Sequence, residues 1–370
     1  MQETIAHIGS EFECENIDSG EWEQVAPGLY RLKIVMVNVY FVGESADNWI
    51  LVDAGLGKCA AMIMDVAEDI YGEGAVPRCI VLTHGHFDHI GALEELVKEW
   101  NVPVYAHPLE LPYLIGLSEY PPADPMVGGG LMALSSFMYP RNPIDLGERV
   151  QRFPDDRSVE GMDEWIILET PGHSPGHVSF FRASDRILIA GDAIVTTKQE
   201  SAFSVMTQKQ ELHGPPSYFT PDWDAAEQSV KKIAMIKPSI VAAGHGIPMQ
   251  GDELDEQLKE LAEHFRDLAV PHHGRYVDSP AVADIAGVVH VPPAVGPSPK
   301  LLTGVAVAAA AGLAVALFMN RKKLLGDSEK VTDDEIRFDR RDVVPPAGYQ
   351  IPATNSRQAH SLTEGSHRNN

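Results

Sequence analysis

Apolar residues along the chain form short runs that predict two groups of β-strands. Residues 25–52 are rich in Val, Ile and Tyr and are interrupted by Gly, which is typical of strands joined by tight turns. Residues 78–83 and 103–106 are further short apolar runs. A second group of strand-like runs follows at 165–169, 178–181, 186–190 and 239–243.

Helical spacing of apolar residues occurs between and after these strands. It predicts helices at 59–71 and 91–100, another at 223–236, and an amphipathic helix at 253–268 that ends the globular part. This alternation fits two sheets packed face to face with helices outside, and periodicity alone supports a doubly wound sheet equally well. Residues 120–143 are rich in Pro, Gly and Met without any period, so we expect a long loop there.

Composition changes after the last predicted helix. Val291–Pro299 is rich in proline, which is typical of a linker. Residues 301–319 carry no charge and would form a helix about 28 Å long, close to the ~30 Å hydrocarbon thickness of a bilayer. We therefore expect an N-terminal segment (1–24), a globular domain (25–275), a Pro-rich linker (276–300), a transmembrane helix (301–319) and a disordered polar tail (320–370).

The predicted span gives conflicting indications of its orientation. Arg321, Lys322 and Lys323 follow it directly, and such residues favour the cytoplasmic side, which would leave the globular domain outside. The N-terminal stretch, Met1–His7, has neither a basic start nor an apolar run, so we expect no secretory signal. Because large domains follow the charge rule poorly, we expect a single-pass membrane protein whose globular domain is cytoplasmic. A buried helix of a soluble protein is the alternative for 301–319.

Small residues form a stripe along the predicted span. Gly304, Ala308, Gly312 and Ala316 recur every four residues, a spacing that lets two transmembrane helices approach closely. The stripe indicates a possible homodimer.

Charge and cysteine content narrow the classes of function. The formal net charge is −24, and the only run of basic residues is 321–323, so a nucleic-acid partner is not expected. The three cysteines, Cys14, Cys59 and Cys79, form no CxxC pair. Their odd number favours a reducing compartment and argues against a disulfide framework or a thiolate zinc site. Any metal ligands are therefore expected among His and carboxylate side chains.

Four such side chains follow the strand predicted at 78–83. His84, His86, Asp88 and His89 lie within six residues, where a tight turn can direct several side chains to one point. Three more ligand types each follow a predicted strand, and the ends of several strands can converge at one edge. These three are His173, Asp192 and His245.

A competing motif overlaps His173. The segment Gly172-His-Ser174-Pro-Gly176 satisfies the GxSxG pattern of the α/β-hydrolase nucleophile elbow. That elbow needs a backbone N–H directly after the serine, which Pro175 lacks, and a helix, whereas a strand-like run follows here. We expect the glycines instead to let the chain turn so that His173 faces a metal.

The order HxHxDH, then an isolated His, Asp and His, resembles the metallo-β-lactamase superfamily over roughly residues 25–270. The resemblance implies an α+β fold, an αββα sandwich with the site at one edge of the sheets. It implies that one metal ion is held by His84, His86 and His173 and a second by Asp88, His89 and His245, with Asp192 bridging the two.

The chemistry implied is hydrolysis at two divalent ions. Histidine and carboxylate ligands suit zinc, and iron or manganese are alternatives. Two ions about 3.5–4 Å apart can share a water and offer it as hydroxide near neutral pH. Asp88 is expected to orient this water or carry a proton. Asp53 and His177 are expected to hold the ligands in place through hydrogen bonds.

The ligand order most resembles the glyoxalase II and lactonase branches. Many β-lactamases have Cys at the bridging position, where this chain has Asp192. It differs from glyoxalase II in lacking a basic cluster for glutathione, and from lactonases in having Ala193–Thr197, without Tyr, after the bridging residue. We expect a small-molecule ester, lactone or thioester substrate. The alternatives are an iron-dependent, persulfide dioxygenase-like oxidoreductase and a membrane scaffold without catalysis.

Overall fold

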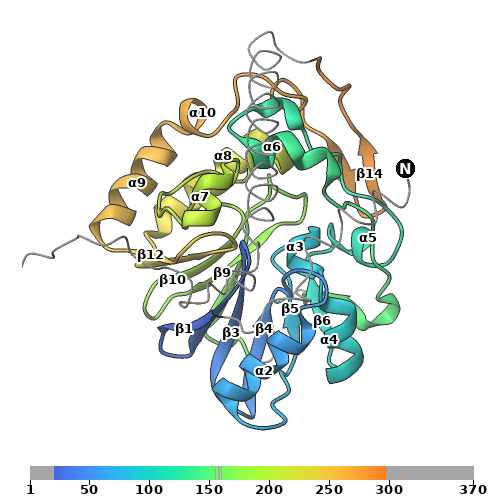
Figure 1. Cartoon of the computed structure of the whole chain (residues 1–370), viewed down its shortest axis with the longest axis vertical. Helices are drawn as coiled ribbons and strands as arrows, with labels where there is room; N and C mark the ends of the chain where they lie inside the picture. The colour runs from blue at the N-terminus through green and yellow to red at the C-terminus, as the bar shows by residue number, and fades with distance from the viewer. Residues whose placement is uncertain (1–20, 155, 157–158, 160, 297–370) are drawn as a thin grey trace, which may run out of the picture. The chain divides into compact units, whose positions relative to one another are not determined.

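The computed structural model describes residues 21–296 of the 370-residue chain, apart from 155, 157–158 and 160 (Figure 1). The predicted span 301–319 and the tail 320–370 lie outside this range. Within it, no helix is long and apolar enough to cross a membrane.

The first sheet contains seven strands in chain order. The first four strands pair antiparallel with one another. The last three strands run parallel to the fourth, because crossover connections that contain helices return the chain to the same end of the sheet. The crossing helices include α2 (Ala60–Tyr71) and α4 (Leu93–Trp100). The strands are β1 (Glu21–Ala26), β2 (Leu29–Ile34), β3 (Val37–Ser45), β4 (Asn48–Val52), β5 (Ile80–Val81), β6 (Val104–Ala106) and β7 (Val150–Arg152).

The second sheet has five strands in the order β12-β11-β10-β9-β8. β10 and β11 are parallel and are joined through helix α8 (Trp223–Ile236), and helix α9 (Asp252–Glu263) follows β12. The strands are β8 (Trp165–Glu169), β9 (Val178–Arg182), β10 (Ile187–Gly191), β11 (Ile240–Ala243) and β12 (Met249–Gln250).

Alternation along the strands explains how the sheets stack. Val39 and Phe41 of β3 pack with the buried residues of α2 and α4, whereas Tyr40 between them packs toward the second sheet. In β10, Leu188 packs with α8 and α9, and Ile189 packs toward the first sheet. Figure 1 shows α2 and α9 on opposite sides of the strands. The layers are therefore helix, sheet, sheet and helix, which agrees with the expected sandwich and not with a single doubly wound sheet.

The segment 120–143 differs from the expected loop, because it contains short helices. Asp124 accepts a hydrogen bond from the backbone N–H of Met126 (3.0 Å) and caps the first of them. Ala133 and Tyr139 pack with Tyr218 into a small apolar cluster that orders the rest. The helices are η2 (Pro125–Val127), α6 (Leu131–Ser135) and η3 (Ser136–Met138).

Six further short helices connect the strands. They are α3 (Phe87–Ile90), α5 (Leu111–Leu114), η4 (Gly147–Arg149), α7 (Ala202–Thr207), η5 (Ser217–Phe219) and α10 (Phe265–Leu268).

Part of the expected linker 276–300 is a β-hairpin. β13 (Val282–Asp284) pairs antiparallel with β14 (Gly287–His290), and Val288 N–H donates to Ser118 Oγ (3.1 Å). The apolar residues of the hairpin are largely exposed, so the sequence gives no alternating pattern that predicts it.

The cysteines differ from the expectation. Cys79 is buried and is not part of a disulfide, but Cys59 at the start of α2 is disulfide-bonded. The cysteine count argued against a disulfide framework and did not foresee this single disulfide, since an odd count still leaves one pair available. The cysteines therefore no longer support a reducing compartment.

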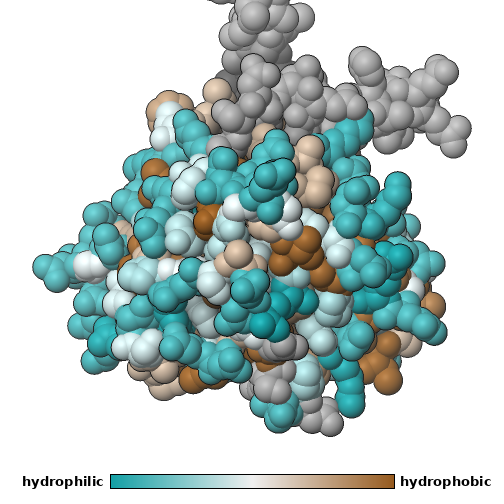
Figure 2. All heavy atoms as spheres, turned by 90° about the horizontal axis from the view of Figure 1, so that it is seen from below, coloured by the Kyte–Doolittle hydropathy of each residue, from teal (hydrophilic) through white to brown (hydrophobic). Residues whose placement is uncertain are grey.

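Hydrophilic residues dominate the face of the molecule in Figure 2, and its apolar residues lie in small groups. This agrees with an excess of acidic over basic residues, 53 against 29, in the whole chain.

Candidate metal centre

The HxHxDH motif lies at the carboxyl end of the central parallel strand β5. His84 and His86 occupy the loop after β5, and Asp88 and His89 lie on the short helix α3 that follows. All four side chains are buried. The turn from strand to helix therefore brings four ligand-type side chains to one edge of the first sheet, as predicted.

The other three ligands come from the second sheet. His173 lies in the loop between β8 and β9, Asp192 directly follows β10, and His245 follows β11. Glycines allow these approaches. Gly172 has φ +134°, a region that other residues rarely adopt, and a Cβ on Gly244 would collide with Asp192 Oδ1.

All seven predicted ligands meet at one point. They form three overlapping groups of three residues. Within each group, the possible ligand atoms lie within 4.8 Å of one another, and every member is buried. Two of the groups are the ones that the resemblance implies, and the third joins them. The groups are His84, His86 and His173; Asp88, His89 and His245; and His84, His89 and Asp192.

Asp192 lies between the two implied groups. Its Oδ2 is 3.4 Å from His173 Nε2 and 3.1 Å from His245 Nε2, while its Oδ1 is 3.5 Å from His89 Nε2. One carboxylate thus contacts ligands of both groups, which is the position a bridging residue requires.

Several polar atoms at the centre are oriented as metal ligands would be. His84 Nε2 is buried without a hydrogen-bond partner, and His89 Nε2 and Asp192 Oδ1 face each other across 3.5 Å without a hydrogen bond, whereas buried polar atoms are normally paired. The opposite nitrogens are held, His84 Nδ1 at 3.0 Å from Thr83 Oγ1 and His89 Nδ1 at 2.8 Å from Asp53 Oδ2. Imidazoles fixed at one nitrogen and open at the other are what a metal ion needs. The residues present therefore fit two divalent cations.

Burial controls protonation at the centre. It lowers the pKa of His84 and His173 well below the usual range and that of His86 to about 3, so these imidazoles are neutral and have a lone pair to donate. Burial also acts to lower the pKa of His89 and His245, but nearby carboxylates outweigh it and hold both pKa values above the usual one. These are Asp192 and Asp53 beside His89, and Asp192 and Asp88 beside His245.

Burial and neighbouring charges also set the pKa values of the two carboxylates, Asp88 and Asp192. Burial raises the pKa of Asp88. Burial also acts to raise the pKa of Asp192, but His245 and His89 outweigh it and keep that pKa well below the usual value. The pKa values of the two carboxylates are therefore shifted in opposite directions, that of Asp88 upward and that of Asp192 downward.

Asp53 contacts the ligands as the sequence predicted. It has φ +63°, an uncommon conformation for a non-glycine residue, and accepts hydrogen bonds from Thr83 N–H and Thr83 Oγ1, both at 2.8 Å. Its Oδ2 also holds His89 Nδ1. The carboxylate thereby orients His89 with Nε2 directed inward.

His177 touches the centre through the backbone. Its Nε2 accepts the N–H of Asp192 (2.9 Å), and its Nδ1 lies 2.9 Å from Thr170 Oγ1. Burial lowers the pKa of His177 to about 3, which keeps the ring neutral and able to accept. It fixes the start of the segment that carries Asp192.

Glu110, which sequence reasoning missed, ties the two ligand loops together. Its buried carboxylate accepts hydrogen bonds from Gly85 N–H (3.1 Å), Gly176 N–H (2.7 Å), Ser174 Oγ (2.8 Å) and the Tyr120 hydroxyl. Gly85 lies between two ligands of the first loop, and Gly176 follows His173. The serine of the GxSxG pattern therefore serves this network.

His245 has two partners that the sequence also did not reveal. Its Nδ1 lies 2.6 Å from the Met36 carbonyl oxygen and 3.1 Å from Gln199 Nε2. The Met36 carbonyl accepts the Nδ1 proton, and this contact directs Nε2 toward Asp192 and Asp88.

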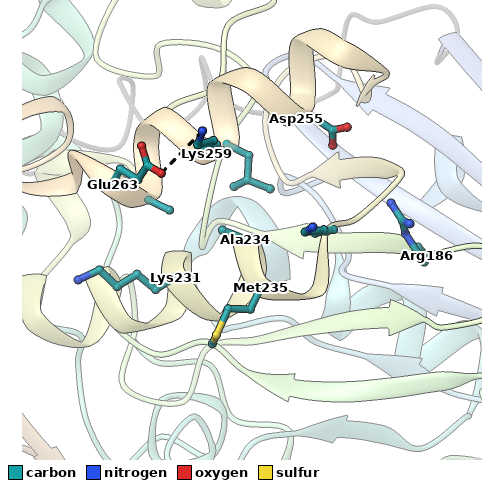
Figure 3. Close-up of a pocket in the computed structure, with 10 residues that line it drawn as sticks. Arg186, Lys231, Ala234, Met235, Asp255, Lys259 and Glu263 are labelled. Atoms are coloured by element: carbon teal, nitrogen blue, oxygen red, sulfur yellow. Dashed lines mark ion pairs between the residues drawn. The ribbon is translucent and has the colours of Figure 1, made fainter.

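Two cavities differ in what they offer. A small space of about 10 Å³ adjoins His86 and His173. A groove of about 630 Å³ lies between α8 and α9, where Figure 3 shows Lys231 and Met235 facing Lys259 and Glu263. None of the seven ligands lines that wider groove, and Lys259 and Glu263 are paired across 4.0 Å. Of these two cavities, the narrow space is the one that adjoins predicted ligands.

Stacked sheets with a buried histidine and carboxylate cluster at their edge define a metal-dependent enzyme class. A family model described as "Metallo-beta-lactamase superfamily" matches residues 32–245. The chain belongs to the metallo-β-lactamase superfamily.

Two relatives described as probable metallo-hydrolases agree with this assignment. "Probable metallo-hydrolase YflN" of Bacillus subtilis (strain 168) is 45% identical over 255 residues, covering 68% of this chain and 97% of YflN. "Probable metallo-hydrolase YybB" of the same strain is 28% identical over 233 residues, 63% of this chain and 90% of YybB. Among solved structures, the BLEG-1 B3 metallo-β-lactamase is 23% identical with a TM-score of 0.45, covering 64% of this chain and 98% of that one. TTHA1623 in a di-iron-bound form is also 23% identical, with a TM-score of 0.40, and covers 61% and 96%.

Proposed function

We propose that the protein is a dinuclear metal-dependent hydrolase that cleaves a small ester, lactone or thioester. The observation that carries this proposal is the position of Asp192, which contacts ligands of both groups through its two oxygens. Such an arrangement serves two ions that act together, because a single ion needs only one group.

Two divalent ions, zinc as the first choice, would be held by the two groups and joined by Asp192. When bound, they would supply Lewis acidity and lower the pKa of a water molecule toward neutrality. Neutral His84, His86 and His173 would hold the first ion. Asp88, His89 and His245 would hold the second ion, with both imidazoles in their deprotonated form.

The proton step falls to Asp88. Its Oδ2 lies 3.4 Å from His245 Nε2, at the edge of the second group, and burial raises its pKa. A carboxyl with a raised pKa accepts a proton from the attacking water and returns it to the leaving oxygen or sulfur more readily than an ordinary one. Ser174 is not the nucleophile in this proposal, because its Oγ already donates a hydrogen bond to Glu110.

The same ligand set would also suit an iron-dependent, persulfide dioxygenase-like oxidoreductase. The relatives at 45% and 28% identity are described as probable metallo-hydrolases, which favours hydrolysis. Zinc, iron and manganese are distinguished by metal analysis of the purified protein.

The proposal is tested on the full chain by metal analysis with a panel of esters, lactones and thioesters. We expect two ions per chain and a hydrolytic activity that is lost on chelation and restored by added metal. His173→Ala should lose metal and activity. The exposed histidine variant His272→Ala, a matched control, should lose neither. Consumption of O₂ with a persulfide, without ester hydrolysis, would establish the oxidoreductase alternative instead.

We also propose that residues 301–319 anchor the protein in a membrane with the catalytic domain on the cytoplasmic side. The proposal rests on the absence of charge in this stretch. Protease accessibility in intact cells compared with spheroplasts tests the orientation. Gly312→Leu tests the homodimer, which should dissociate if the small-residue stripe forms it.

A further inference from the structure

The narrow space beside the metal centre has an uncharged wall. His86 and His173 form one side of it. The remaining lining residues are three aromatic residues and three prolines, none of which carries a charge. They are Tyr120, Pro121, Pro122, Phe219, Pro221 and Tyr276.

The hydroxyl groups of the two tyrosines are already engaged. Tyr120 donates to Glu110 and accepts from Gly85 N–H (3.0 Å), and the Tyr276 hydroxyl donates to the Pro122 carbonyl (2.5 Å). Their rings therefore present carbon to the space. The Tyr120 ring lies 4.6 Å from that of His86, so this apolar wall directly adjoins a predicted metal ligand.

None of the residues that line the space has a cationic side chain to pair with a carboxylate. The Arg275 guanidinium lies 5.9 Å from the centroid of the Tyr276 ring, but Arg275 does not line the space. A carboxylate placed against the wall would lose its hydration without gaining a partner.

We propose that this wall receives a slim, apolar, uncharged substituent next to the scissile bond, so that the enzyme selects neutral substrates over ones bearing a carboxylate there. The inference rests on the proposed function and names its substrate class. The space holds about 10 Å³, roughly the volume that one water needs. Entry of a substituent therefore requires the 120–122 segment or Tyr276 to move outward.

The test compares two esters of equal acyl length on the metal-loaded full chain, p-nitrophenyl butyrate and p-nitrophenyl hemisuccinate. The second carries a carboxylate where the first ends in a methyl group. We expect kcat/KM for the butyrate to exceed that for the hemisuccinate by on the order of a hundredfold. Equal values, or a preference for the hemisuccinate, would overturn the inference.

Adding a cation to the wall should change this ratio. Pro122→Lys keeps the backbone carbonyl that Tyr276 uses and places an ammonium group at the space. We expect it to raise kcat/KM for the hemisuccinate by about tenfold or more relative to the butyrate. Pro122→Leu, which adds only bulk, and Met235→Lys, which adds a cation in the distant α8–α9 groove, should leave the ratio unchanged. An equal response to Pro122→Leu and Pro122→Lys would contradict a charge effect.

Binding provides a readout that needs no turnover. Thiolates coordinate divalent metals, so 1-butanethiol and 3-mercaptopropionate can be titrated against the cobalt-substituted protein by its absorption. We expect the neutral-tailed thiol to bind at least tenfold more tightly. Equal affinity in a metal-loaded protein would overturn this inference alone, whereas failure to bind any metal would overturn the proposed function and this inference with it.

Discussion

The two sheets contribute to the metal centre in different ways. The first sheet supplies four predicted ligands from the six-residue segment His84–His89, whereas the second supplies three predicted ligands from three separate strand ends. The first set is brought together by a local turn. The second set exists only after β8, β10 and β11 have paired and stacked on the first sheet. The bridging carboxylate belongs to this second set.

Support of the ligands follows the same division. Asp53 and Thr83 hold His84 and His89 from within the first sheet. Glu110 instead joins the two sheets, because its carboxylate accepts from the loop of each. Variants should therefore separate residues that act on one group of ligands from those that act on both.

The largest effect is expected for Asp192→Ala. It removes the carboxylate that contacts His89, His173 and His245, and so should disrupt both groups at once. We predict loss of at least one metal ion per chain and a fall in kcat/KM on the order of a thousandfold or more, since several kcal/mol of charge stabilisation are at stake. Metal analysis and ester kinetics measure it, and an unchanged metal content would show that Asp192 does not join the groups.

Asp88→Asn should have a more selective effect than Asp192→Ala, because it changes one group of predicted ligands and the proton step. It keeps the shape of a side chain on α3 but removes its charge and its capacity to carry a proton. We predict a fall in kcat of about 10²–10⁴-fold, with the ion at the group of His84, His86 and His173 retained. Full activity with two bound ions would remove Asp88 from the proton step.

Glu110→Gln should weaken metal binding without touching a ligand. The amide cannot accept from all four donors, so the loops that carry His84, His86 and His173 lose their common support. We predict about 10–100-fold weaker metal affinity, measured by competition with a chelator.

The matched control for Glu110 is Asp124→Asn. Asp124 is also a buried carboxylate that accepts backbone N–H groups, from Met126 and Arg275, but it holds no ligand loop. The metal affinity of the Asp124→Asn variant should stay within about threefold of that of the original protein. If both variants lose metal equally, the effect of Glu110 is one of general stability and not of ligand position.

His177→Phe should have the smallest effect. It leaves the buried Asp192 N–H without an acceptor, and we predict a loss of about 1–3 kcal/mol in the free energy of unfolding. Thermal unfolding of the metal-free protein measures it, and the metal-loaded protein should keep two ions. A loss of metal larger than that of Glu110→Gln would reverse the order predicted here.

Local pattern explains what the sequence could predict. The αββα layers follow from runs such as Val37–Ser45, in which alternate residues serve two different cores. The first ligand set is contiguous in the sequence, and the resemblance located His173, Asp192 and His245 from the order of ligands alone.

Residues without a local signal were missed. Glu110 is one of 53 acidic residues, and only the folded chain brings Gly85 and Gly176 to it. The contact of His245 with the Met36 carbonyl joins residues 209 positions apart. The disulfide of Cys59 likewise depends on tertiary structure, which a count of cysteines does not contain.

Anomalous X-ray diffraction from crystals of the metal-loaded protein tests the central claim most directly. The account predicts two metal peaks, one against His84, His86 and His173 and the other against Asp88, His89 and His245, with Asp192 in contact with both. A single peak, or metal bound away from these side chains, would contradict a dinuclear centre built by the two sheets together.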